Sequence, residues 1–435
     1  MKKVNIFWLR RDLRLHDNAG LYHALKSKFP VVPIFIFDKN ILDDLEDKCD
    51  RRVQFIYDEL LAMQATLEQK RSSLHVYYGT PEDIFKKLGN EYDVQQVFTN
   101  HDYEPYAIER DQKIKSLLSK KNIGLKTFKD HVIFEKDEVL KDDGKPYTVF
   151  TPYSKKWKSL LTPFYLKSYP VDKYQNNFLE QAPRAFPSLQ SMGFRETDKK
   201  FPPKNPGADL LEHYDETRDF PGVKGTSHLG IHLRFGTISI RKLVAKAKQV
   251  NAVFLNELIW REFYSSILWH FPRVGHQKSF KPEYDNIKWR NNEKEFEKWC
   301  QGETGFPIVD AGMRELNETG YMHNRVRMIT ASFLIKDLLI DWRWGEAYFA
   351  SKLLDFELAS NNGGWQWTAG CGCDAAPYFR VFNPNLQTEK FDKDLKYIKK
   401  WVPEFGELTY AQPIVNHAEA KERCIRAYKE AVGKL

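Results

Sequence analysis

The sequence predicts an N-terminal α/β domain with a doubly wound parallel sheet, followed by an all-α C-terminal domain. In the N-terminal part, short runs of β-branched and aromatic residues alternate with helical patterns, as they do in βαβ units. From Gly207 onward the pattern is helical to the end, broken by proline and glycine. A chain of 435 residues is also long for one hydrophobic core, so two domains are expected.

The α/β domain is expected over residues 1–134. No G-x-G-x-x-G follows its first strand, so the usual dinucleotide fingerprint is absent. Strands are predicted at Val4–Leu9, Val31–Phe37, Leu74–Tyr78, Gln96–Thr99 and Leu125–Phe128, and helices at Asn18–Ser27, Arg51–Lys70, Pro81–Leu88 and Tyr106–Ser119.

Residues 135–206 are irregular and rich in proline, lysine and tyrosine, which predicts an interdomain connector. The helical domain is then expected over residues 207–435. Of the 11 tryptophans, only Trp8 and Trp157 precede it. A buried indole N–H needs a hydrogen-bond partner, so this excess favours base stacking or cofactor chemistry, although packing of a large core accounts for part of it.

Composition narrows the class of protein. The hydrophobic content of 42% excludes a disordered chain, and the net charge of +8 points to a polyanionic partner as readily as to a solvated basic surface. No apolar run reaches transmembrane length, and no secretory segment precedes the first strand. Five scattered cysteines suit a reduced, cytoplasmic protein.

The stretch from Asn361 to Trp367 reads NNGGWQW and follows a helix-like run, Tyr348 to Leu358. Paired asparagines and glycines predict a tight bend where backbone can approach a ligand closely. The two tryptophans beside it suit the lining of a large flat ring system. A helix C-cap followed by core aromatic residues fits the same pattern.

A second cluster, Gly225 to Gly230, reads GTSHLG and opens a helical run. Small hydroxyl residues at a helix start can donate to a phosphate, and an ordinary N-cap fits them equally. A third cluster contains Glu257, Trp260 and Arg261, which share a helix face. A surface Glu257–Arg261 ion pair with Trp260 in the core is the alternative.

A fourth cluster joins Arg325 and Arg327 to the acidic residues Asp355 and Glu357. Arginines two positions apart point to different sides of a helix. Arg327 and Asp355 are predicted to form a bidentate ion pair; an ordinary ion pair between two helices is the alternative.

These motifs resemble, in order, those of the DNA photolyase/cryptochrome family, most closely its class I cyclobutane-dimer photolyases. The resemblance extends from Asn5, at NIFWLRRDLRLHDN, to about Trp401. It is strongest from Thr319 to Trp367, which reads TGYMHNRVRMITASFLIKDLLIDWRWGEAYFASKLLDFELASNNGGWQW. The resemblance implies a monomer that binds FAD in its helical domain, flips a pyrimidine dimer out of DNA and splits the dimer with an electron from the excited, reduced flavin. Its N-terminal domain would carry an antenna pigment, a deazaflavin or a folate.

The resemblance also implies roles for single residues. The residues expected to be catalytic are Glu257, Trp260, Asn324, Met328, Asn361 and Trp367, of which Asn361 would lie beside flavin N5. Those expected to bind FAD are Tyr214, Thr226, Ser227, His228, Leu229, Gly230, Phe254, Arg327, Asp355, Glu357 and Asn361. Those expected at DNA are Arg218, Glu257, Trp260, Arg261, Asn324, Arg325 and Gln387. Trp289, Trp342 and Trp365 would pass electrons from the surface to the flavin, and no metal is implied.

Three alternatives remain open: a cryptochrome-type blue-light receptor, repair of 6-4 photoproducts, and a bare nucleotide-binding module. The short charged helix after Trp401 differs from the C-terminal extension of many receptors. Enzymes for 6-4 photoproducts carry two histidines where this chain has Asn324 and Met328, neither of which can shuttle a proton. The region of Gly275 and His276 lacks the Cys-Lys pair of some folate-binding relatives, which disfavours folate as the antenna.

Overall fold

The first unit of the fold contains a parallel sheet of five strands. In the computed structural model, which describes residues 1–198 and 200–433, the strand order is β3-β2-β1-β4-β5. Every residue of β2 is buried, as expected for a strand covered on both faces. The strands are β1 Lys3–Leu9, β2 Val31–Asp38, β3 His75–Gly79, β4 Asp93–Asn100 and β5 Gly124–Phe128.

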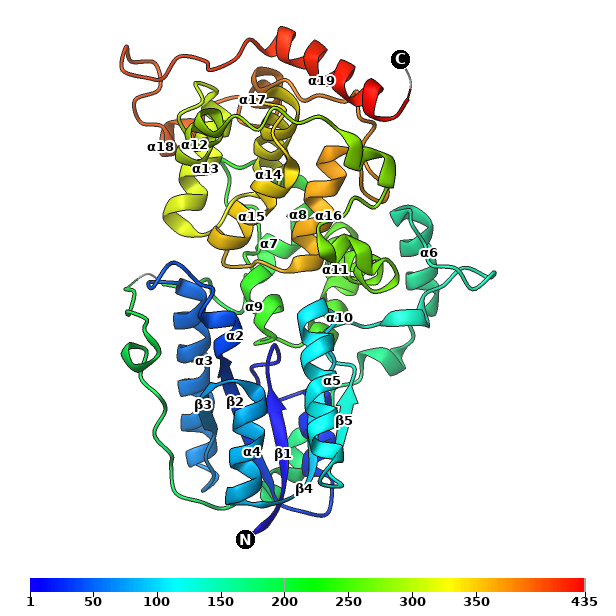
Figure 1. Cartoon of the computed structure of the whole chain (residues 1–435). Coiled ribbons are helices and arrows are strands. Elements are labelled where there is room, and N and C mark those ends of the chain that lie inside the picture. Colours follow the sequence, from blue (N-terminus) through cyan, green and yellow to red (C-terminus); the bar gives the residue numbers. More distant parts are fainter. Residues whose placement is uncertain (199, 434–435) are drawn as a thin grey trace. The chain divides into compact units, whose positions relative to one another are not determined.

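Alternate residues of these strands face two different layers. Ile6 and Ile34 pack in one hydrophobic cluster with Phe85 of α4 (Pro81–Glu91) and Ile114 of α5 (Pro105–Ser119). Phe7 faces the other way, because a Cβ added to Gly20 in α1 (Ala19–Leu25) would lie 2.8 Å from its ring. The sheet is therefore doubly wound, as predicted (Figure 1).

The chain divides into two compact units. The first comprises residues 1–135, 160–205 and 228–246, and the second comprises residues 136–159, 206–227 and 247–435. The segment predicted as a connector thus contributes residues 136–159 to the second unit and 160–205 to the first. Besides α1, α4 and α5, the helices that lie in or begin in the first unit are α2 Lys39–Leu42, α3 Arg51–Glu68, α9 Gly230–Phe235 and α10 Ile240–Val250.

The second unit is helical, as predicted. Its core is one cluster of buried side chains that includes Trp299, Trp342 and Trp365. Its helices are α6 Phe150–Leu160, α7 Ala208–Glu212, α8 Tyr214–Thr217, α11 Ala252–His270, α12 Glu293–Gln301, α13 Pro307–Thr319, α14 Asn324–Ser332, the π-helical turn Phe333–Asp337, α15 Trp342–Lys352, α16 Leu358–Ala369, α17 Pro384–Phe391, α18 Lys396–Trp401 and α19 His417–Ala431.

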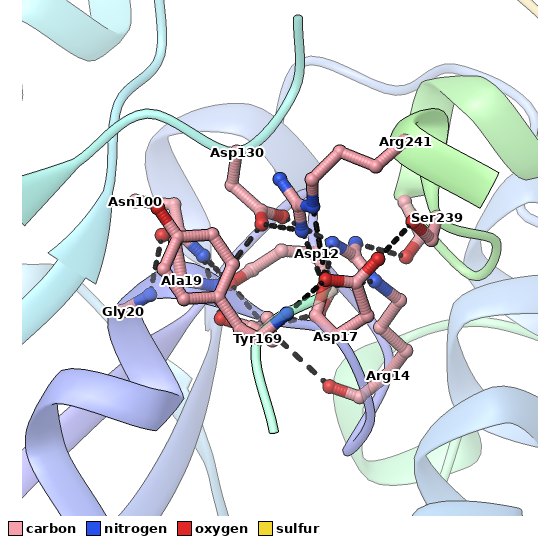
Figure 2. A network of polar contacts seen from close by, with 12 residues as sticks. Asp12, Arg14, Asp17, Ala19, Gly20, Asn100, Asp130, Tyr169, Ser239 and Arg241 are labelled. Atoms are coloured by element: carbon pink, nitrogen blue, oxygen red, sulfur yellow. Dashed lines mark hydrogen bonds and ion pairs between the residues drawn. The ribbon is translucent and has the colours of Figure 1, made fainter. Parts of the chain in front are cut away.

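A buried polar network closes the carboxyl edge of the sheet in the first unit (Figure 2). Asp130 accepts from Arg14 at 2.5 Å and from Arg241 at 2.8 Å, and Arg241 also donates to Asp17 at 2.9 Å. These four side chains are at most 6% exposed. The network joins the loop after β1 to the loop after β5 and to α10.

Side chains at the same edge accept hydrogen bonds from the free backbone N–H groups at the N-terminus of α1. The Leu21 N–H donates to Asn18, the Ala19 N–H to Asp130 at 3.1 Å, and the Gly20 N–H to Asn100 at 2.8 Å. Such N–H groups bind phosphate in many parallel α/β folds. Here the chain's own side chains occupy them.

In the described part of the chain, no helix combines the length and the apolar character needed to cross a membrane.

Candidate active site and cofactor cavity

One face of α11 forms a wall of a cavity of about 370 Å³ in the second unit. Glu257, Trp260, Arg261 and Tyr264 follow one another at helical spacing and all line it. The α-helical period therefore brings together the residues that the third sequence cluster singled out.

The carboxylate of Glu257 is held by an arginine from outside α11. Arg218, directly after α8, forms an ion pair with it. Burial raises the pKa of Glu257 above its ordinary value, and Arg218 opposes that shift. The alternative of a surface Glu257–Arg261 pair is wrong, because Arg261 donates instead to Glu357 at 2.8 Å.

The two arginines of α14 diverge. Arg327 lines the cavity, and its Nη2 donates to both oxygens of Asp355, at 2.9 and 3.1 Å. The predicted ion pair is present, but one nitrogen makes both bonds, because Nε donates to the Met322 carbonyl instead. Arg325 turns away, donates to Asp219 at 2.8 Å and lies 4.2 Å from the Phe391 ring centroid. Asn324 and Met328 line the cavity as well.

The stretch from Asn361 to Gly364 is not a bend or a helix C-cap. It lies inside α16, which ends at Ala369 with Gly370 as its C-cap. Packing explains the difference: a Cβ at Gly363 would lie 2.2 Å from the Tyr264 ring, so α16 approaches α11 closely there. The Asn362 amide donates to Glu346 at 2.9 Å. Tertiary contacts therefore override the local preference of asparagine and glycine for turns.

This helix still supplies the cavity with the residues expected of it. Asn361, Trp365 and Trp367 line the cavity together with Gly364. A Cβ built on Gly364 meets no atom within 4 Å. The missing side chain at this position therefore leaves open space against the wall.

Three ion pairs surround the cavity: Arg218–Glu257, Arg261–Glu357 and Arg327–Asp355. Each cation has a carboxylate partner, so these pairs add little net charge to the lining. Their hydrogen bonds restrict the side chains that line the cavity.

The residues predicted to bind a phosphate are divided between the two units. Thr226 and Ser227 belong to the second unit, whereas His228, Leu229 and Gly230 belong to the first. The helix α9 starts at Gly230 with Leu229 as its cap residue and no side-chain cap bond, so the ordinary N-cap alternative is wrong.

Thr226 is connected to the cavity through Tyr321. The two hydroxyl groups lie 2.9 Å apart, and the Arg327 guanidinium lies 5.8 Å from the Tyr321 ring centroid. Tyr214 and Phe254 contact each other at 5.0 Å between ring centroids. Neither of them, nor Gln387, is among the residues that line the cavity.

The three tryptophans of the predicted electron series all pack in the second unit's core. Trp365 is 3% and Trp342 1% exposed. Trp365 contacts Phe349 and Trp299, with ring centroids at 5.0 and 6.2 Å, and Trp289 contacts Tyr428 at 6.1 Å. Across residues 1–198 and 200–433, no ring contact joins two of the three directly.

Two family models match this arrangement. The one described as "FAD binding domain of DNA photolyase" matches residues 254–409, which include most of the cavity, and the one described as "DNA photolyase" matches residues 5–171. A curated relative from Halobacterium salinarum, a deoxyribodipyrimidine photo-lyase, is 35% identical over 99% of this chain and 100% of its own. The chain belongs to the DNA photolyase family.

Solved photolyases share the fold over the whole chain. A bacterial class III photolyase from Agrobacterium tumefaciens superposes with a TM-score of 0.87 at 33% identity and covers 100% of this chain and 98% of its own. An archaeal photolyase from Sulfolobus tokodaii, described with two FAD molecules, reaches 0.84 at 35% identity and covers 99% and 100%.

The cavity of this photolyase fits a flavin. Its volume lies within the range of ligand sites, and the open space beside Gly364 admits a flat ring. The Arg327–Asp355 pair and the Asn361 amide provide donors and acceptors on the same walls. FAD is therefore the cofactor of this domain.

Some cavity residues escaped the sequence analysis. Tyr264 follows Glu257 by two helical turns on the same face, so the helical period could have revealed it. Phe349 and Thr368 also line this photolyase cavity, but they carry no signal that distinguishes them from core residues.

Proposed function

We propose that this photolyase repairs cyclobutane pyrimidine dimers in DNA with blue light. The observation that carries the proposal is the convergence of six side chains on one cavity. They come from three helices: Glu257 and Trp260 from α11, Asn324 and Met328 from α14, and Asn361 and Trp367 from α16. Together they offer two indole rings, two amides, a carboxylate and a thioether.

Bound FAD supplies the light-excited electron donor for splitting the cyclobutane ring. Arg327, Asp355 and Asn361 would hold its ring system, and Thr226 and Ser227 would hold its phosphates. Asn361 suits a reduced flavin because an amide adds no negative charge to the site. An aspartate in its place would repel an anionic ring through a low-dielectric contact.

Glu257 and Asn324 would hold the dimer by hydrogen bonds to its base edges, and Trp260 and Trp367 would stack on its rings. Base–aromatic stacking contributes about 1–3 kcal/mol per base.

Selectivity for cyclobutane dimers follows from the absence of a proton shuttle at the lesion side. Asn324 and Met328 do not titrate. His323 caps α14, where its Nδ1 accepts the Arg325 N–H at 3.1 Å. Burial lowers the pKa of His323 to about 4, so it is neutral at pH 7. A 6-4 photoproduct needs proton transfer, which these residues would not supply.

The decisive experiment is repair of defined oligonucleotides after chemical reduction of the flavin. Illumination should restore oligonucleotides with a cyclobutane dimer and leave those with a 6-4 photoproduct unchanged. Repair of the 6-4 product alone would contradict this specificity. Repair of neither, by protein with a full complement of flavin, would favour a light receptor.

We also propose that Trp289, Trp342 and Trp365 conduct electrons to oxidised flavin. Hopping between oxidisable indole rings replaces one long, slow step. Trp342→Phe should then abolish light-driven reduction and leave repair by chemically pre-reduced protein intact. Transient absorption and the repair assay, run on one preparation, test the two halves separately; loss of both activities with a normal flavin spectrum would contradict the role.

DNA binding is proposed to be largely electrostatic, through Arg218 and Arg325. Each phosphate contact that is lost should lower the slope of log affinity against log salt by roughly 0.9. Arg325→Gln should reduce that slope, as measured by titration at several salt concentrations. An unchanged slope would remove Arg325 from the DNA-binding surface.

The chain is further proposed to act as a cytoplasmic monomer. Each of its five cysteines carries a free thiol, which suits a reducing compartment. Light scattering of the FAD-loaded protein tests whether it is a monomer, and a dimer mass would contradict that part of the proposal.

A further inference from the structure

One face of the Trp260 ring is covered by another aromatic ring. Phe150, the first residue of α6, stacks on it with ring centroids 3.7 Å apart and planes 5° from parallel. Phe150 is 9% exposed and is not among the residues that line the cavity, whereas Trp260 is. Trp260 therefore presents to the cavity only its edges and the face opposite Phe150.

Phe150 is fixed through its backbone as well as through its ring. Its backbone N–H donates to the Asp374 carboxylate at 3.0 Å. Asp374 lies in the loop that follows α16, the helix of Trp367. Phe150 thus contacts α11 through Trp260 and the loop after α16 through Asp374.

The rest of α6 is anchored on α11. The Trp157 indole N–H bonds to Glu262, Tyr153 contacts Phe263 with ring centroids 5.1 Å apart, and Lys158 donates to Asn256 at 2.7 Å. These contacts restrict sliding of α6 along α11. The Phe150 ring is therefore a fixed support rather than a mobile cover.

We propose that Phe150 is a positioning residue for binding of the pyrimidine dimer. It acts through Trp260 and does not contact the dimer itself. By fixing the plane of Trp260, it keeps the opposite indole face oriented for a flipped-out base. This inference rests on the proposed function. The physical reason is preorganisation: a stacking surface that is rigid before binding loses no rotamer freedom when the base arrives.

The first test replaces Phe150 with leucine or methionine, which fill the space without offering a ring face. The dissociation constant for a single-stranded oligonucleotide with one cyclobutane dimer should rise about 3- to 10-fold, the usual contribution of an aromatic pair. The constant for the undamaged oligonucleotide should stay unchanged, because phosphate contacts dominate it. Phe150→Tyr should restore dimer affinity.

The matched control is Phe306→Leu. Phe306 is also a buried phenylalanine of the second unit, but its ring packs on Phe333, with ring centroids 4.7 Å apart. Both leucine variants should lower the thermal unfolding midpoint, and only the Phe150 variant should reduce the preference for dimer over undamaged DNA. Equal loss of preference in both would reduce Phe150 to a packing residue.

A double-mutant cycle separates action through Trp260 from any other cause. In a Trp260→Ala background, Phe150→Leu should leave dimer affinity unchanged. An effect as large as in the wild-type background would overturn the proposal. If the wild-type protein showed no preference for the dimer, the proposed function would fail at that earlier step, and the inference with it.

Discussion

Two regions of this protein contain buried arginine–carboxylate pairs, and they differ in what surrounds the pairs. At the carboxyl edge of the first unit's sheet, Arg14 and Arg241 contact Asp17 and Asp130, and these side chains fill the space themselves. In the second unit, the three pairs surround a cavity of about 370 Å³.

The comparison shows that charged pairs alone do not mark a ligand site. The edge of a parallel sheet is a common ligand site, yet here the α1 N–H groups are already bonded to Asn18, Asn100 and Asp130. In the second unit, glycine and amide residues of α16 leave space beside the pairs. Space beside polar groups, rather than the groups themselves, distinguishes the site.

The largest expected effect comes from breaking the network of the first unit. Arg241→Ala removes a cation from two carboxylates that are 1% exposed, so the free energy of unfolding should fall by about 3–5 kcal/mol. Urea unfolding followed by circular dichroism measures it. Lys86→Ala, which breaks an exposed pair with Asp83 at 3.1 Å, should change the free energy of unfolding little, because solvent screens that pair; similar costs for both variants would refute the distinction.

The second prediction concerns the order in which acid weakens the two units. Burial holds the pKa of His323 near 4, below its ordinary 6.5, so the unfolded chain takes up a proton first as the pH falls. Stability from this group is complete above pH 6.5 and is lost toward pH 4, by up to about 3 kcal/mol.

The contribution of Asp130 to the stability of the first unit is lost at a lower pH than that of His323. Burial by itself would raise its pKa, but Arg14 and Arg241 outweigh burial and lower it from 3.8 to about 2. His323→Asn, which preserves a capping acceptor, should therefore flatten the fall in stability between pH 6.5 and 4. Denaturant midpoints at several pH values check this; an unchanged fall would assign the effect to other groups.

The third prediction compares neighbouring glycines of α16. Gly363→Ala should cost about 1–3 kcal/mol, because its Cβ would meet the Tyr264 ring at 2.2 Å. Gly364→Ala should be neutral or stabilise by up to about 1 kcal/mol, because its Cβ enters open space. Unfolding free energies test both. Gly364→Leu should keep the fold and lose flavin, read as the absorbance ratio of flavin to protein; full flavin retention would place the ring elsewhere.

The smallest expected effect is at a solvent-exposed helix cap of the first unit. Thr80→Ala removes the side-chain acceptor for the Asp83 N–H at the start of α4 and should cost about 1 kcal/mol. A shift in the thermal midpoint of a few degrees would fit, and a loss as large as that of Arg241→Ala would contradict the difference between an exposed cap and the buried network.

The sequence by itself determined the strands, the doubly wound sheet and the helical second part. The predicted strand Val31–Phe37 corresponds to β2 because a strand covered on both faces needs an unbroken apolar run. The helical period likewise placed Glu257 and Trp260 on one face of α11. Such patterns are local, so they survive without knowledge of the rest of the chain.

Only the tertiary structure decided which distant residues meet. Asn361 to Gly364 became helical because Tyr264 and Glu346 pack against that stretch. Glu257 paired with Arg218 rather than Arg261, which stands one turn away in the same helix. Phe150 met Trp260 across a long stretch of intervening chain. Contacts between segments far apart in sequence depend on how the whole chain packs, and no local period encodes that choice.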